Sequence, residues 1–293
     1  MLQITSLTIS TRTQRLLANK QDQINILANY TQEVQKASTL WDGKSSTSIY
    51  FSEIKAKLKK MAVAHHTCNY CENETGSHVE HIFPKSLYPD KTFVWDNYLW
   101  ACSICNSDYK GSKFKTFNAP NTPQHTDITP LNPRNYNRPN NDALLINPRS
   151  ENPMHFLWLD LKTGVFVERQ NQRTRDWWRA NYTIELLALN NREELVKGRK
   201  KAYNEYWNML NRYINVLNAT NFNELDAAYS QATPVPRNKA FNFIQTQCCL
   251  NIQEAILTYP HPTVWEEMKR QHLHYPKLAN LFTQIPTALT WSI

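Results

Sequence analysis

Residues 68–106 read CNYCENETGSHVEHIFPKSLYPDKTFVWDNYLWACSICN, and this stretch decides how the middle of the chain folds. It begins with a Cys-x-x-Cys pair and closes with another. Two residues between thiolates let both sulfurs reach one tetrahedral ion, so two such knuckles complete a closed structural site. The sequence therefore predicts a structural Zn²⁺ whose loss should unfold the unit, bound by Cys68, Cys71, Cys102 and Cys105.

Redox chemistry is the alternative for these cysteines. A redox motif needs one isolated Cys-x-x-Cys near a βαβ pattern, whereas this chain has two pairs and no such pattern. Six cysteines in 293 residues are too few for a disulfide scaffold, and their pairing is typical of a reducing compartment, so we expect a cytoplasmic protein. Residues 72–101 separate the knuckles and are long enough to hold a β-hairpin. Cys248 and Cys249 lie in an apolar helical stretch and are expected in the core.

Composition sets broad limits on the partners. The formal charge of +8 and the pI near 9.1 suit a polyanion such as a nucleic acid, although many ordinary proteins are mildly basic. No apolar run is long enough to cross a bilayer, so no membrane partner is expected. Four basic stretches are candidate phosphate contacts, and a helix surface with lysines is more often only solvated: Lys55–Lys60, Lys110–Lys115, Arg169–Arg179 and Lys197–Lys201.

An acid, a histidine and an amide lie within or beside the knuckles. Val79–Phe83 has strand composition and ends at Pro84. Neighbours on a strand point to opposite sides, so Glu80 and His81 reach one centre only at a bulge or sharp twist. His81 is a candidate general base, and the Glu80 carboxylate and the Asn106 carbonyl suit a hard cation such as Mg²⁺ or Mn²⁺. An activated water and a cation are what phosphodiester hydrolysis requires.

Further polar residues complete this candidate site. Asn97 is suited to hydrogen-bond backbone and to fix either the hairpin loop or the orientation of the imidazole. Lys110 follows Asn106 by four residues on the expected helix Ser103–Tyr109 and could meet a phosphate. Each residue alone has an ordinary structural interpretation, and their joint placement favours function. Other candidates are Lys85 and Lys113 as nucleic-acid contacts and His78, His65 and His66 as weaker rival bases.

These residues resemble the HNH endonuclease superfamily across about residues 68–117. The matching segments are Cys68-x-Tyr-Cys71-Glu, Val79-Glu80-His81-Ile82-Phe83-Pro84-Lys85-Ser86 and Trp95-Asp96-Asn97-x-Leu-x-Ala-Cys102-x-x-Cys105-Asn106-x-x-x-Lys110-Gly111. The resemblance implies a ββα-metal fold with His81 as general base, Glu80 and Asn106 as ligands of the catalytic cation, and Asn97 as the structural asparagine. Three features depart from the commonest pattern of the family. Glu80 stands where aspartate is commonest, and Asn106 stands in place of the last histidine. Three residues instead of two separate Asn106 from Lys110.

A second, weaker resemblance spans about residues 50–205. Leu144-Leu145-Ile146-Asn147-Pro148-Arg149, the Trp158 hairpin and the stretch from Thr183 to Arg199 are similar to the HNH subunit of Septu-type anti-phage systems and their retron-associated relatives. This implies a bacterial effector nuclease acting on DNA or RNA. It also implies a partner ATPase of the ABC/SMC-like kind, and in retron systems a reverse transcriptase with its single-stranded DNA. The alternatives are a zinc-stabilised binding module without catalysis and a stand-alone restriction-type HNH nuclease.

The expected fold is α+β and mostly helical, with an HNH ββα-metal finger and its four-cysteine zinc site between helical flanks. We expect four regions: an N-terminal helical segment (1–64), the nuclease module (65–118), a Pro/Asn-rich loop with a β-hairpin (119–173) and a C-terminal helical, partner-binding region (174–293). Periodicity and turn signals place the elements. They predict helices over Gln14–Lys36, Ser52–Ala64, Asn223–Gln231, Asn238–Thr258 and Pro262–His272, one capped by Asn191, and a hairpin over Met154–Arg169.

Overall fold

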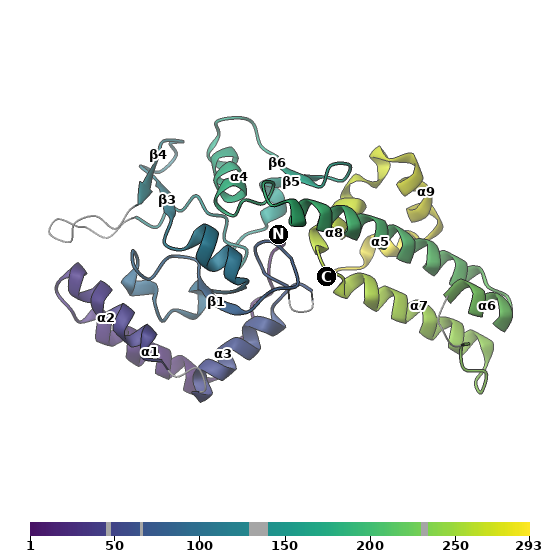
Figure 1. The fold of residues 1–293 in the computed structure, drawn as a ribbon, viewed down its shortest axis with the longest axis horizontal. Helices are drawn as coiled ribbons and strands as arrows, with labels where there is room; N and C mark the ends of the chain where they lie inside the picture. Colours follow the sequence, from purple (N-terminus) through teal and green to yellow (C-terminus); the bar gives the residue numbers. More distant parts are fainter. Residues whose placement is uncertain (45–47, 65–66, 129–139, 230–233) are drawn as a thin grey trace.

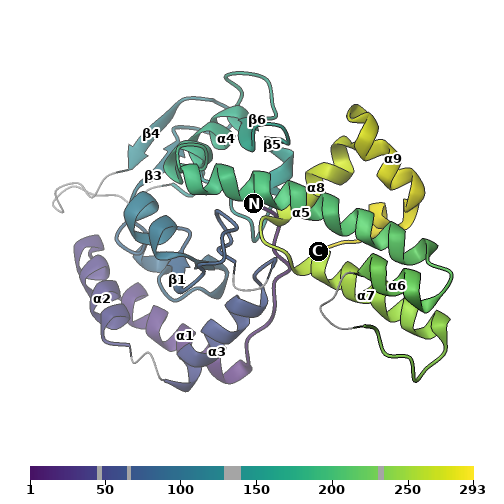
Figure 2. The ribbon, with the colours of Figure 1, turned by 45° about the vertical axis from the view of Figure 1, so that its right-hand side comes forward.

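The computed structural model describes residues 1–44, 48–64, 67–128, 140–229 and 234–293. The fold is α+β and mostly helical, as predicted, and its strands form two-stranded antiparallel sheets. Figures 1 and 2 show the N-terminal helices at the lower left, the short sheets above and beside them, and the last helices of the chain at the right. Within the described ranges, no helix is long and apolar enough to span a membrane.

The first sixty residues form three helices, α1 (Thr11–Asn25), α2 (Tyr30–Asp42) and α3 (Ile49–Lys60). The single helix expected over Gln14–Lys36 is wrong, because the Asn29 side chain accepts the N–H groups of residues 31 and 32 and starts a second helix. The helix expected over Ser52–Ala64 starts and ends earlier, at the bounds of α3. Residues 1–10, all described, form no strand before α1.

A hairpin and a short helix lie between and after the cysteine pairs. Strand β1 (His78–His81) pairs antiparallel with β2 (Tyr98–Ala101), and Glu80 lies opposite Leu99. The helix η3 (Ile104–Lys110) follows β2 in wide π turns, one residue later than the expected Ser103–Tyr109. The long connection between the strands contains the short helical turns η1 (Pro89–Lys91) and η2 (Trp95–Asn97). The chain thus runs strand, loop, strand, helix through this unit.

Two more hairpins follow the unit along the chain. β3 (Phe114–Phe117) pairs with β4 (His125–Ile128), a hairpin that was not expected in a Pro/Asn-rich stretch. β5 (Leu157–Asp160) pairs with β6 (Val165–Glu168), which confirms the predicted hairpin. Its turn needs Gly164, because φ is +73° there and a Cβ would lie 2.9 Å from the Val196 carbonyl oxygen.

The C-terminal region consists of helices. These are α4 (Arg175–Leu186), α5 (Glu193–Asn218), α6 (Phe222–Tyr229), α7 (Phe241–Thr258), α8 (Pro262–Gln271) and α9 (Pro276–Gln284). Figure 1 shows α5 running from the middle of the molecule along α7 into this region. Asn191 is not the cap of α5, since Arg192 holds that position without a capping bond. Cys248 and Cys249 are buried on α7, as expected.

Candidate functional site

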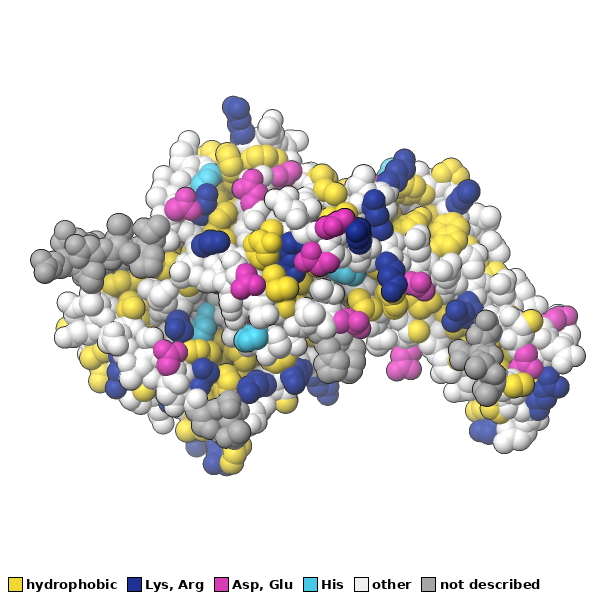
Figure 3. Space-filling model, viewed as in Figure 1, with side chains coloured by type: hydrophobic (Ala, Val, Ile, Leu, Met, Phe, Trp, Pro, Cys, Tyr) yellow, Lys and Arg dark blue, Asp and Glu magenta, His cyan; other side chains and the backbone are white. Residues whose placement is uncertain are grey.

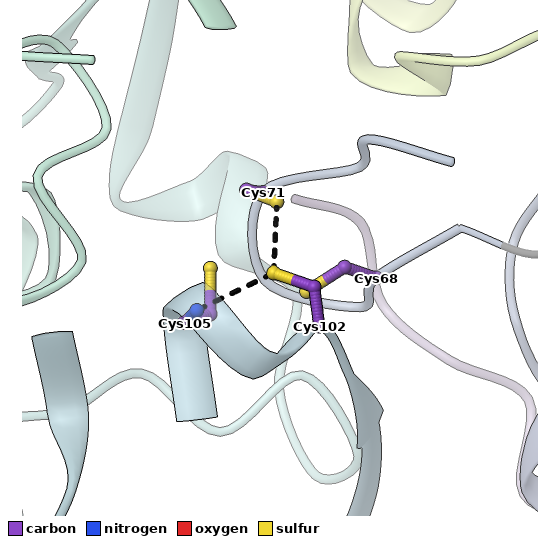
Figure 4. A group of neighbouring side chains, drawn as sticks. All are labelled: Cys68, Cys71, Cys102 and Cys105. Carbon is purple, nitrogen blue, oxygen red and sulfur yellow. Dashed lines mark hydrogen bonds between the residues drawn. The ribbon is translucent and has the colours of Figure 1, made fainter. Parts of the chain in front are cut away.

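The four cysteines form a compact cluster. Cys68 and Cys71 lie in a turn before β1, and Cys102 and Cys105 follow β2 at the start of η3. All are buried, and their sulfur atoms lie within 4.8 Å of one another, with 3.8 Å between Cys71 Sγ and Cys102 Sγ (Figure 4). A tetrahedral ion with Zn–S bonds of about 2.3 Å places sulfurs about 3.8 Å apart. The donor set therefore fits a metal such as zinc.

The electrostatics of this cluster favour a bound cation. Burial raises the pKa of the Cys68 thiol well above its usual value. Hydrogen bonding from Cys105, Cys68 and Cys71 lowers the pKa of Cys102. The buried thiols cannot all ionise together unless a positive charge compensates them, and a divalent cation supplies that charge.

Arg192 brings a positive charge to the same cluster from the start of α5. Its Nη1 donates to Cys105 Sγ at 3.2 Å, and its Nε donates to Glu194 at 3.0 Å. Burial alone lowers the pKa of Arg192, but Cys105 and Glu194 outweigh burial and raise it. The role of Arg192 was missed from the sequence, where its only signal was a position at the start of a predicted helix. Arg192 thus joins the C-terminal helices to the cysteine cluster.

Glu72 makes a second link between this cluster and the C-terminal region. It follows the first cysteine pair with φ at +64°, and its buried carboxylate accepts from Thr263 Oγ1 at 2.6 Å. The Met1 amino group lies 2.8 Å from the same carboxylate. The backbone N–H of Thr263 donates to this carboxylate as well, at 3.2 Å. The knuckle is therefore held from α8 as well as from α5.

Glu80 is paired with a lysine of η3. Glu80 Oε1 lies 2.5 Å from Lys110 Nζ, which also donates to the His81 carbonyl oxygen at 2.7 Å. Only 3% of Glu80 and 1% of Lys110 are exposed. Burial raises the pKa of Glu80, and the Lys110 ammonium offsets only part of that rise. The ammonium of Lys110 is therefore enclosed, which does not fit the phosphate contact expected of it.

The His81 side chain has different neighbours from those of Glu80, as alternation along a strand requires. Its Nε2 lies 2.9 Å from the Thr92 carbonyl oxygen. Its ring packs edge-on against Trp41 of α2 and Tyr98 of β2. Burial, with smaller contributions from Lys110, Lys85 and Lys44, lowers the pKa of His81 to about 3, and the hydrogen bond to Thr92 offsets part of that shift. The imidazole is thus neutral at neutral pH and able to accept a proton, although so low a pKa makes it a weak base in this buried state.

Asn97 ties together the two ends of the hairpin loop. Its Oδ1 accepts from Phe83 N at 2.8 Å, and its Nδ2 donates to the carbonyl oxygens of Phe83 and Lys91 at 3.0 and 2.9 Å. Of the two roles considered for Asn97, these contacts are those of a residue that fixes the loop. The loop carries Thr92, so Asn97 acts on the imidazole only through the backbone. Arg149 braces the same turn by donating to the carbonyl oxygens of Trp95 and Tyr98.

Where the structure describes them, the remaining candidate residues are less buried than Glu80 and His81. Asn106 is half-buried near the start of η3, and among the described residues the ion-pair partner of Glu80 is Lys110 rather than Asn106. Lys85 is half-buried, and Lys113 is exposed. His78 is exposed, and its Nδ1 lies 2.8 Å from the Ser77 hydroxyl. The two rival bases His65 and His66 lie outside the residues that the structure describes.

Comparison with known proteins adds no identity to this geometry. No family model matches the chain, and no curated protein matches it.

Proposed function

We propose that this protein is an HNH-type endonuclease that hydrolyses phosphodiester bonds of nucleic acid, with His81 as general base. The observation that carries the proposal is the imidazole itself. It is neutral, it is oriented by the Thr92 carbonyl oxygen, and it lies in a hairpin that Asn97 fixes beside a cysteine cluster suited to zinc. A carbonyl oxygen can only accept, so the proton sits on Nε2 and Nδ1 keeps the lone pair that takes a proton from water.

The cysteine cluster supplies the scaffold in this proposal. Zn²⁺ bound by Cys68, Cys71, Cys102 and Cys105 fixes the turn before β1 to the turn after β2. That fixes the position of His81, which lies on the hairpin between the pairs. A zinc ion with four cysteine ligands has no open coordination position, so this zinc holds structure and does not activate water.

The proposed catalytic cation is Mg²⁺ or Mn²⁺, with Glu80 and Asn106 as oxygen donors. The arrangement described above does not fit that cation as it stands, because Lys110 Nζ already compensates the Glu80 carboxylate at 2.5 Å. Oxygen ligands of Mg²⁺ must be free to approach the ion at about 2.1 Å. The chemistry assigned to this chain is therefore limited to the base, its orientation and its supporting loop.

Basic side chains near the site give the proposed nucleic acid a route to it. Figure 3 shows a row of Lys and Arg side chains across the lower left of the visible face, over α3. That helix ends in Lys57, Lys59 and Lys60. Lys44 and Lys85 are close enough to His81 to affect its charge. Positive charge around a cleavage centre attracts the phosphate backbone and weakens with salt.

The biological setting is proposed from the sequence resemblance to Septu-type and retron-associated defence systems. In that setting the chain is a bacterial effector nuclease in the cytoplasm, and the C-terminal helices α5 to α9 bind a partner ATPase. Co-purification of the natively expressed protein tests this: an ABC/SMC-like ATPase in stoichiometric amount supports it, and a protein that elutes alone and cuts at full rate contradicts it.

The cleavage test compares the zinc-loaded protein with His81→Ala on supercoiled plasmid, single-stranded DNA and RNA, in Mg²⁺ or Mn²⁺. We expect the substitution to remove at least about 99% of the rate, in line with the loss of a general base. Zinc content and circular dichroism must match between the two proteins, and His78→Ala is the control. Unchanged cleavage by a folded His81→Ala protein would exclude the mechanism.

A non-catalytic binding module is the second candidate, and the Glu80–Lys110 pair favours it. A carboxylate that is compensated by a buried lysine can serve the fold without a bound metal ion. This candidate predicts salt-dependent binding of nucleic acid with no turnover under any metal condition, with or without the partner ATPase. The cleavage test above separates the two.

A further inference from the structure

The last turn of α2 reaches the His81 imidazole from outside the cysteine-bounded unit. The centroid of the Trp41 ring lies 4.2 Å from that of His81, with 66° between the planes. The Tyr98 ring also packs on the imidazole, at 5.2 Å and 83°. Trp41 itself is fixed in the core by edge-on and tilted contacts with Phe51 and Phe93. The imidazole is thus held by aromatic rings from two elements distant in sequence.

These contacts leave the imidazole one orientation. Trp41 and Tyr98 pack on the ring, and Thr92 binds its Nε2. The same Thr92 carbonyl oxygen accepts the Tyr98 hydroxyl at 2.7 Å. A ring turned by about 180° would place a carbon against that oxygen, and the other tautomer would place an unprotonated nitrogen there, which has no proton to donate. The packing therefore selects both the rotamer and the tautomer of the proposed base.

Lys44 holds the indole in place. Its Nζ donates to the Trp41 carbonyl oxygen at 2.8 Å and lies 4.1 Å from the centroid of the Trp41 ring. It also lies 5.2 Å from the Phe51 ring. A cation over an aromatic face is attracted to it, most strongly for tryptophan. Lys44 thus restrains the side chain that restrains His81.

We propose that Trp41 is a positioning residue for His81, so that the N-terminal helices form part of the catalytic unit. The kinetic part of this proposal depends on the proposed nuclease function, and the structural part does not. Trp41 contacts neither the phosphodiester nor the attacking water; it keeps Nδ1 of His81 available and correctly aimed. A small misplacement of a reacting group can cost about 100-fold in rate.

The experiment uses the full-length zinc-loaded chain and ¹⁵N NMR of the His81 imidazole. Trp41→Leu keeps an apolar side chain without a ring, Trp41→Phe keeps a ring, and Trp177→Leu on α4 is the matched control. In the parent protein we expect Nε2 protonated and Nδ1 unprotonated. In Trp41→Leu the two nitrogens should give averaged signals, and the rate constant kcat should fall roughly 10- to 100-fold with KM within about twofold. Trp41→Phe should restore both, and the control should match the parent.

The proposal is overturned if a folded Trp41→Leu protein keeps the parental imidazole signals and kcat, because Trp41 would then be only a core residue. Should Trp41→Leu fail to fold, Lys44→Gln replaces it: broadened His81 signals support the proposal, and unchanged signals overturn it, with Lys60→Gln as control. If the parent protein cleaves no nucleic acid, the nuclease function fails, and the NMR measurements alone decide whether Trp41 sets the imidazole.

Discussion

Lys110 Nζ lies 2.5 Å from Glu80 Oε1 and also donates to the carbonyl oxygen of His81, the residue after Glu80. A buried ion pair therefore joins η3 to β1. Two charges removed from water depend on each other, and removal of one partner leaves the other uncompensated. The pair therefore holds the proposed catalytic strand in place and also occupies the carboxylate that the sequence assigned to a cation.

This pair predicts strong coupling between two substitutions. Glu80→Gln and Lys110→Met should each lower the free energy of unfolding by about 3 kcal/mol or more, since each strands a buried charge. The double variant should lose clearly less than the sum. Urea unfolding of the zinc-loaded proteins measures this, with Lys113→Met as the exposed control. Losses that simply add would show that the two groups do not interact.

Zinc removal should unfold the central unit. We expect about one Zn²⁺ per chain by elemental analysis, and a strong chelator should abolish the cooperative unfolding transition, because a structural zinc contributes folding free energy directly. Cys102→Ser should lose the metal. Cys248→Ser, which changes a buried cysteine of α7 remote from the cluster, should keep it. A metal-free protein with the native transition would contradict the assignment.

Arg192 should increase the affinity of the cysteine cluster for zinc. Its hydrogen bond to Cys105 Sγ stabilises the thiolate, and loss of such outer contacts commonly costs about 10- to 100-fold in metal affinity. We expect Arg192→Ala to release zinc to a competing chelator in this range more readily than the parent. Lys201→Ala, an exposed change on the same helix, provides the comparison. Equal zinc release from all three proteins would remove Arg192 from this role.

The pKa of His81 predicts a pH dependence of definite sign. The folded value of about 3 lies below the value of about 6.5 in an unfolded chain, so the unfolded state binds more protons between these limits. His81 then contributes stability that is complete above about pH 6.5 and is lost as pH falls toward 3. NMR should show a neutral imidazole at pH 5.5. A half-protonated ring at that pH would mean that the burial is not present in solution.

Asn97 should contribute to the stability of the folded protein, whatever its part in catalysis. Its three hydrogen bonds to the loop backbone predict a loss of about 3 kcal/mol for Asn97→Ala, at about 1 kcal/mol for each bond. Asn97→Asp keeps the acceptor and loses the donors, so its stability should lie between that of the parent protein and that of Asn97→Ala. Thermal unfolding of the zinc-loaded proteins tests this. An Asn97→Ala protein as stable as the parent would mean that the loop closes without it.

The sequence determined the features that depend on local spacing. Two residues between thiolates dictate a chelate, and the long interval between the pairs holds the hairpin. Helical periodicity placed α5, α6, α7 and α8 to within a few residues but gave no range for α4 or α9, and the Lys-Thr-Gly turn placed the β5–β6 hairpin. The break between α1 and α2 was also encoded locally, by the cap at Asn29, but it was obscured by continuous polar periodicity.

Only the tertiary structure decided what each side chain meets. Convergence of Glu80 and His81 on one centre required a bulge or sharp twist in the strand. In the fold, Glu80 instead pairs with Lys110, and His81 contacts Trp41 and Thr92. Nothing in the sequence indicated that Arg192 would donate a hydrogen bond to Cys105, which lies 87 positions earlier in the chain. These partners are distant in sequence and are selected by packing and by the compensation of buried charge. A pattern read along the chain specifies which groups are present, whereas the folded core determines which of them share an environment.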